Sequence, residues 1–224
     1  MEQPNRPYLT WLPYVIPFVY FLALTALEQS AGPAWYPAIY TAKIVVLTAG
    51  LWLIRGSYPE LKPGGKGVWL GVILGPVLAA AWVLIDLVTP HLKVLGTRSA
   101  FDPFTSIHSP GLAWLFIVIR LFGITAIAPL IEELFYRSFL LRIVVNPDNF
   151  QKVPIGTYDL VSFIAVILLM ASAHPEYIAA AVFSAVMNLL LIRSKNLWST
   201  IAAHASTNFA LALYVLVFHA WKYW

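Results

Sequence analysis

Long apolar runs separated by short polar connections make up most of the chain. Seven runs can be drawn, at 12–29, 36–54, 68–88, 111–131, 158–173, 177–193 and 196–218. Each is close to the ~20 residues that a helix needs to cross a bilayer. The runs are continuous rather than alternating, so they predict helices and not the strands of a membrane barrel. The sequence therefore predicts an all-α, polytopic transmembrane helix bundle.

The fourth run continues beyond its expected end. After Pro129 the sequence reads LIEELFYRSFLLRIVV, which extends the helical pattern to about Val145. Proline removes a backbone donor, so we expect a kink at Pro129 and an eighth element after it. No polar stretch is long enough to form a separate domain. The prediction is a single integral membrane domain, 1–224, of seven to eight helices.

Composition supports the membrane interpretation. Hydrophobic residues make up 60% of the chain and charged residues 11%, against about 25% in soluble domains, and the mean hydropathy is +0.78. The formal charge is +4, but Lys and Arg are spread singly, which argues against a nucleic-acid surface. The expected surroundings are a lipid bilayer. The chain has no Cys, which excludes thiolate metal sites and a Cys nucleophile.

The basic residues of the connections predict an orientation. One side of a seven-span arrangement has eight: Arg6, Arg55, Lys62, Lys66, Arg142, Lys152, Arg193 and Lys195. The other side has three: Lys93, Arg98 and Lys222. The positive-inside rule then places the N-terminus in the cytoplasm. We expect a multi-pass protein of the cytoplasmic (inner) membrane of a prokaryote, with a retained first span rather than a cleaved signal peptide.

Charges within the spans are the candidates for function, because an ionisable group in lipid is costly unless it is paired or faces a cavity. Charges at span ends are interpreted as solvated boundary residues: Glu28, Arg55, Asp86, Arg142 and Arg193. Lys43 and Arg120 lie deeper and receive no chemical role. Six polar residues of the second half remain: Glu132, Glu133, Arg137, His174, His204 and Asn208.

Helical spacing predicts which of these residues face one another. Glu133 and Arg137 are four residues apart and share a helix face, whereas Glu132 points ~100° away and can face a cavity. Glu132 lies ~20 Å before Val145 and His174 ~24 Å after Tyr158. If these two helices form a hairpin, the carboxylate and the imidazole reach a similar depth.

The last span brings two more groups to that depth. His204 and Asn208 lie ~12 and ~18 Å along it. Such a set suits acid–base hydrolysis, in which Glu132 and His174 activate a water while His204 and Asn208 stabilise an oxyanion. Arg137 would orient Glu133. The structural alternative is a polar network that only ties helices together, but helix contacts alone do not require adjacent glutamates and two histidines at matched depth.

These motifs resemble a known family. The pattern E-E-x-x-x-R (132–137), a His closing an apolar helix (His174) and H-x-x-x-N (204–208) is similar to the CAAX prenyl protease and bacteriocin-processing (CPBP, or Abi) family, which includes the type II CAAX prenyl endopeptidase. The likeness covers about 111–218. It implies an eight-helix intramembrane peptidase with Glu132, His174, His204 and Asn208 catalytic, supported by Glu133 and Arg137. Members usually have Phe where this chain has Met170.

The resemblance implies a substrate of the type that the family processes. This is a peptide or lipid-modified protein cut near its C-terminus, with a prenylated CAAX peptide as the best-known case. We expect no cofactor. The less favoured alternative is a catalytic Zn²⁺ held by Glu132, His174 and His204; the chain has no H-E-x-x-H pair, and Arg137 puts a cation near the ion.

Two other functional classes use the same residues. A small transporter or proton relay would pass protons or a solute through the buried groups, but internal repeats, which would favour it, are not visible in the sequence. A non-catalytic immunity or scaffold protein would keep the pocket as a remnant. Loss of activity in a Glu132→Ala variant separates the enzyme from the scaffold.

Overall fold

The protein is a helical bundle. The computed structural model describes residues 10–61, 65–92 and 100–224, and every regular element within them is helical. Eight helices result when Pro110–Val145 is counted as one continuous helix. This confirms the prediction of an all-α, polytopic bundle of seven to eight helices.

Three helices form the first half of the bundle: α1 (Leu12–Ser30), α2 (Tyr36–Ile54) and α3 (Val68–Val88). Proline in the first turn of α1 and of α2 fits the helix start, where the missing N–H has no intrahelical partner to lose. A short helix, α4 (Pro103–Ser106), begins with Asp102, whose side chain accepts from the Phe104 N–H.

The central helix runs from Pro110 to Val145 without a break. It consists of α5 (Pro110–Phe122), the π-helical turn η5 (Gly123–Ile127), α6 (Ala128–Glu133), a second π-helical stretch η6 (Leu134–Leu140) and α7 (Leu141–Val145). The kink expected at Pro129 takes the form of this widened helix: η5 ends two residues before the proline. π-Helical turns of this kind occur frequently at functional sites.

The last three helices are α8 (Leu160–Ser172), α9 (Tyr177–Ser194) and α10 (Leu197–Phe218). Asp159 and Asn196 cap α8 and α10 by accepting from backbone N–H groups of the first turn. Within the described residues, six helices have the length and composition of membrane spans, and α8 is shorter. Its 13 residues extend ~20 Å, less than the ~30 Å hydrocarbon core. Of the seven predicted spans, the fifth is therefore too short to cross alone.

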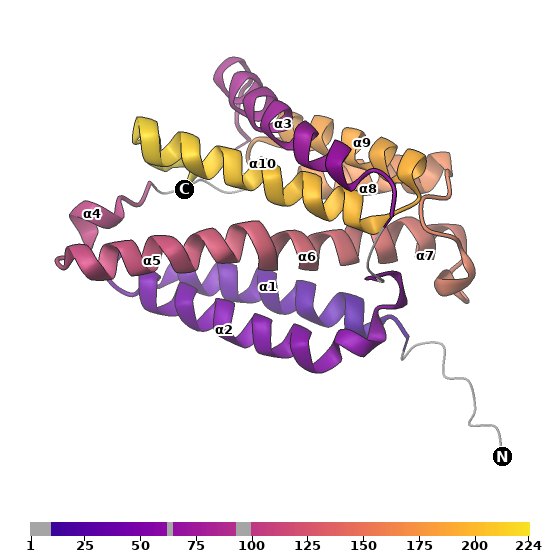
Figure 1. Ribbon diagram of the computed structural model, residues 1–224, viewed down its shortest axis with the longest axis horizontal. Coiled ribbons are helices and arrows are strands. Elements are labelled where there is room, and N and C mark those ends of the chain that lie inside the picture. The colour runs from indigo at the N-terminus through magenta and orange to yellow at the C-terminus, as the bar shows by residue number, and fades with distance from the viewer. Residues whose placement is uncertain (1–9, 62–64, 93–99) are drawn as a thin grey trace.

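The central helix separates two groups of helices (Figure 1). The pair α1 and α2 lies on one side, while α10 lies on the other with α3, α8 and α9 beyond it. Close contact between α3 and α10 depends on small residues: a Cβ added to Gly71 would lie 2.2 Å from the Ser199 carbonyl oxygen. Small residues let helix backbones approach closely in membranes.

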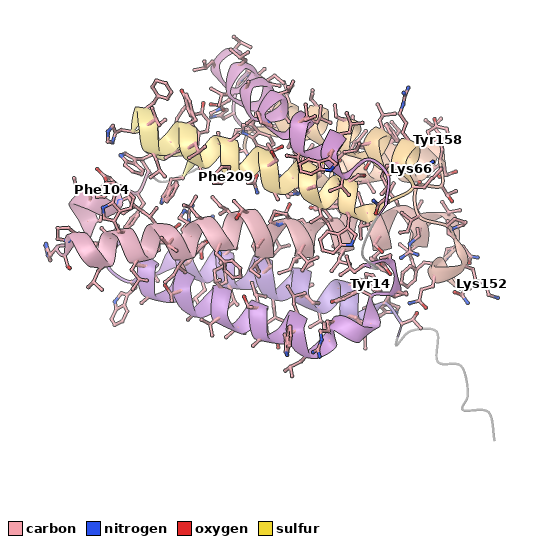
Figure 2. The ribbon with its side chains drawn as sticks, in the orientation of Figure 1. Tyr14, Lys66, Phe104, Lys152, Tyr158 and Phe209 are labelled. Atoms are coloured by element: carbon pink, nitrogen blue, oxygen red, sulfur yellow. The ribbon has the colours of Figure 1, made fainter. Side chains whose placement is uncertain are left out.

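Two basic residues that the charge count assigned to one side lie at one end of the bundle. Figure 2 shows Lys66 and Lys152 at the same end, with Phe104 of α4 at the opposite end. This arrangement agrees with the predicted topology. The chain is thus an integral, multi-pass membrane protein by the number and hydropathy of its helices.

Three of the charges interpreted as solvated boundary residues are buried and paired, which corrects that expectation. Glu28 lies 2.6 Å from the Lys43 Nζ atom, and Asp86 lies 2.9 Å from the Lys222 Nζ atom. Arg142 pairs with a glutamate of the loop after α2 at 3.2 Å. The sequence position of a charge near a span end does not reveal that another helix covers it and supplies a counter-charge.

The C-terminal turn is held against α3. Tyr223 and Lys222 both donate hydrogen bonds to Asp86 at the end of α3. Hydrogen bonds with Tyr223 and Asp86 raise the pKa of the Lys222 ammonium above its ordinary value. This anchoring brings the neighbouring Trp224 into the wall of the cavity described next.

Candidate active site

A cavity of about 200 Å³ lies where the central helix, α10 and the end of α8 meet. Four of the predicted site residues line it: Glu132, His174, His204 and Asn208. The other two, Glu133 and Arg137, lie beside it and are fully buried. The structure therefore brings together all six residues that the sequence singled out, from three helices.

One face of the central helix forms a wall of this cavity. Its lining residues recur every four positions, at Arg120, Ile124, Ala128 and Glu132. In a regular α-helix each four-residue step turns the side chain ~40° further round. The π-helical turn η5 has more residues per turn and reverses part of this drift. These four side chains, which we call the four-residue stripe, therefore all face the cavity from Arg120 to Glu132.

Asn208 compensates for the backbone disruption at η5. The Ala128 N–H bonds to the Gly123 carbonyl, and the next residue, Pro129, has no N–H. The Ile124 carbonyl is thus left without a helical donor, and the Asn208 side-chain amide donates to it at 2.8 Å. A second amide hydrogen remains on the same nitrogen. Asn208 accordingly has a structural contact that its sequence spacing did not predict.

Replacing Asn208 with Leu is expected to lower the free energy of unfolding by about 1–3 kcal/mol, because the Ile124 carbonyl then loses its side-chain donor. Denaturant or thermal unfolding in detergent measures this. Phe209→Leu is the matched control, since Phe209 is half-exposed on the outer surface of the same helix. Equal stability of Asn208→Leu and the wild type would contradict the role assigned to this hydrogen bond.

Glu133 joins Arg137 and His204. Its Oε1 atom lies 3.3 Å from the Arg137 Nη1 atom, as the four-residue spacing predicted, and 2.9 Å from His204 Nδ1. The contact with His204 was not predicted. It fixes the orientation of the imidazole ring, because one nitrogen is held by the carboxylate and Nε2 is the nitrogen that can serve the cavity.

Arg137 ties the central helix to two others. Its Nη2 atom donates to Ser184 Oγ of α9 at 3.2 Å, and its guanidinium lies 3.4 Å from the Met170 sulfur of α8. Met170, the position at which the resemblance implies Phe, is fully buried against the arginine. The substitution thus keeps an apolar, polarisable contact at this position.

Glu132 faces the cavity with no hydrogen-bond or ion-pair partner recorded among the described residues. Its neighbour Glu133 contacts both Arg137 and His204 instead. The two adjacent carboxylates therefore differ in environment, as their ~100° separation on the helix predicts. An accessible carboxylate in a cavity is available to accept a proton from water.

His174 enters the cavity from the turn after α8. Its Nδ1 atom donates to the Met170 carbonyl oxygen at 2.9 Å, so the neutral ring carries its acceptor on Nε2. Trp82 of α3 packs against the ring edge-to-face, with 5.7 Å between centroids. Hydrogen bond and indole together fix the ring beside the cavity that also holds Glu132.

The residues of the alternative zinc site lie around the same cavity. Among the residues that the structure describes, no group of three or more His, Asp or Glu side chains is arranged to hold a metal ion. Glu132, His174 and His204 share the cavity but do not form such a group. The Nδ1 atoms of the two imidazoles bond to the Met170 carbonyl and to Glu133, an arrangement that histidines also have when Nε2 binds a metal.

Several apolar or unassigned residues complete the cavity, and sequence reasoning missed them. Those that line it include Trp82, Arg120, Phe183, Tyr223 and Trp224. Nothing in the sequence marks Trp82 or Phe183, because an aromatic residue in a span looks the same on a lipid-facing surface. Arg120 carried a signal, since an arginine deep in a span is a functional candidate by default.

The comparisons agree with this geometry. Residues 111–210 match the family model described as type II CAAX prenyl endopeptidase Rce1-like, and this segment contains all six site residues. No curated protein and no solved structure gave a significant match. The matched family is one of proteases, and the match lies within the membrane-spanning part of the chain. The resemblance predicted from the sequence is thus confirmed for this segment: residues 111–210 are similar to the Rce1-like type II CAAX prenyl endopeptidase family.

Proposed function

We propose that the protein is an intramembrane endopeptidase that hydrolyses a peptide bond near the C-terminus of a membrane-associated substrate. The observation that carries the proposal is the shared cavity: an unpaired carboxylate, Glu132, and the imidazole of His174 line the same small space as His204 and Asn208. The substrate class that we propose is a membrane-associated peptide or lipid-modified protein, and a prenylated, CAAX-type peptide is the case to test in view of the family match. We propose that the protein is located in the cytoplasmic membrane of a prokaryote.

In the proposed mechanism Glu132 and His174 hold and deprotonate a water. The water oxygen attacks the scissile carbonyl carbon, and the Glu132 carboxylate receives the water proton. When the C–N bond breaks, Glu132 returns this proton to the leaving amine. A positioned acid–base residue of this kind contributes typically 10²- to 10⁴-fold to the rate.

His204 and Asn208 are proposed to stabilise the oxyanion. Glu133 accepts from Nδ1 of His204 at 2.9 Å, and in the doubly protonated ring Nε2 also carries a hydrogen that it can donate. The second amide hydrogen of Asn208 is the other proposed donor. Donors fixed in a water-poor cavity need no reorganisation as charge develops.

The test uses purified protein in lipid vesicles with an S-prenylated peptide that ends in Cys, two aliphatic residues and a variable last residue. Mass spectrometry is expected to find the shortened peptide with the wild type and only intact peptide with Glu132→Ala. A transporter or a non-catalytic immunity protein would leave the peptide intact in both cases.

Removing metal ions is expected to leave hydrolysis unchanged, because the proposed mechanism activates water with Glu132 and His174 alone. The measurement is activity before and after dialysis against a chelator, together with metal analysis of the purified protein. Stoichiometric zinc and loss of activity on chelation would contradict the metal-free mechanism and favour the zinc alternative.

A further inference from the structure

A second cavity, of about 610 Å³, adjoins the first. It lies between α1, α2 and the first half of the central helix. Five residues line both cavities: Phe21, Arg120, Ile124, Ala128 and Trp224. Arg120 has the one charged side chain of this shared wall, and it is buried, with 8% exposed. Any peptide that extends from the first cavity to the second therefore passes this guanidinium.

Arg120 is a buried cation without an anionic partner. Among the described residues no carboxylate lies within ion-pair distance of it, and its Nε atom has no hydrogen-bond acceptor. Its Nη1 atom donates to the Tyr36 hydroxyl. The guanidinium also lies 4.9 Å from the Tyr40 ring centroid and 5.1 Å from that of Trp224. These neutral groups position the side chain but leave its charge uncompensated.

The other charges of the second cavity are paired with each other. Lys43 Nζ and the Glu28 carboxylate are 2.6 Å apart and both are buried. That pair is neutral as a unit, so Arg120 is the unpaired charged side chain of the shared wall. An uncompensated cation in a membrane span is costly. The cost is recovered when a ligand supplies an anion, and a carboxylate fits the guanidinium fork with two parallel hydrogen bonds.

The spacing along the central helix relates this cation to the proposed catalytic carboxylate. Arg120 and Glu132 belong to the same four-residue stripe and are twelve positions apart, or ~18 Å along the axis. An extended peptide advances about 3.3–3.6 Å per residue. At most about five residues therefore fit between a bond cut at Glu132 and a group bound at Arg120.

We propose that Arg120 binds the free C-terminal carboxylate of the substrate, with the last side chain received by the second cavity, so that the enzyme cuts within about five residues of a free C-terminus. This inference rests on the proposed endopeptidase function. Arg120 then acts as a specificity residue: it contacts the substrate at its terminal carboxylate and takes no part in activating water.

The test compares two peptides that differ only in their C-terminal group. One is an S-prenylated CAAX-type peptide with a free carboxylate, and the other is the same peptide with a C-terminal amide. We expect wild-type kcat/KM to be ~10- to 100-fold higher for the free acid, the range expected for hydrogen bonds to a charged group. In Arg120→Gln this ratio is expected to fall to about one. Arg120→Lys, which keeps the charge but loses the fork, is expected to give an intermediate ratio.

Arg193→Gln is the matched control, because Arg193 is exposed at the end of α9, and its ratio is expected to equal that of the wild type. Equal cleavage of acid and amide by the wild type overturns the inference and leaves the proposed function standing. A ratio that persists in Arg120→Gln also overturns it. Failure of the wild type to cut either peptide overturns the proposed function itself. The wild-type ratio is decisive even if Arg120→Gln does not fold.

Discussion

The Glu132→Gln variant is expected to lose about 10²- to 10⁴-fold in the rate of peptide hydrolysis while keeping the wild-type fold. The amide has nearly the shape of the carboxylate but cannot accept the proton of the attacking water. Because Glu132 has no recorded partner among the described residues, the change breaks no hydrogen bond or ion pair there. Rates on a prenylated peptide, with thermal unfolding of the same samples, measure both effects.

The control for this variant is Asp148→Asn, which removes a carboxylate from an exposed loop position. Its hydrolysis rate is expected to match that of the wild type. A Glu132→Gln protein that is folded and cuts at close to the wild-type rate would contradict the role of Glu132 as the proton acceptor. A large loss of stability in Glu132→Gln would instead indicate a structural partner for this side chain.

The Arg137→Met variant is expected to lose about 3–5 kcal/mol of stability, the cost of leaving one member of a buried ion pair without its partner. Glu133 would then keep its contact with His204 but lose the guanidinium at 3.3 Å. The hydrogen bond from Arg137 to Ser184 of α9 is lost as well. Unfolding in detergent or denaturant measures the change, and Arg193→Met is the control for removal of an exposed arginine.

A double variant separates charge from packing in this network. Glu133→Gln combined with Arg137→Met removes both charges, so it is expected to be more stable than Arg137→Met alone. The wild type, Glu133→Gln, Arg137→Met and the double variant form a double-mutant cycle, which isolates the interaction energy of the pair. If Arg137→Met is as stable as the wild type, the buried pair does not stabilise the bundle. If the double variant is less stable than either single variant, the charges are not coupled as described.

Much of the fold follows from the sequence, because the length of an apolar run and the spacing of apolar residues within it are local properties of the chain. The run predicted at 68–88 is α3 (Val68–Val88), and the pattern extended to Val145 is one helix from Pro110. The run at 158–173 shows the limit of this reasoning. It looked long enough for a span, but the Asp159 cap and the end at Ser172 leave 13 residues. Helix caps shorten a hydrophobic run in a way that hydropathy alone does not register.

The candidate site was predicted in its members but only partly in its contacts. Four-residue spacing correctly paired Glu133 with Arg137, and depth arithmetic brought Glu132 and His174 into one cavity. The bond between Glu133 and His204 joins positions 71 residues apart and depends on helix packing. The contact of Asn208 with Ile124 depends on a π-helical turn that hydrophobic periodicity does not reveal.

The most direct test of the central claim compares membrane peptides in cells that carry the wild-type protein with those that carry Glu132→Ala. The measurement is the C-terminal ends of membrane proteins, identified by mass spectrometry. The proposed function predicts a set of membrane proteins that are shortened by a few residues with the wild type and full-length with Glu132→Ala. Identical C-termini in the two cell lines would contradict the assignment of this protein as an intramembrane endopeptidase that depends on Glu132.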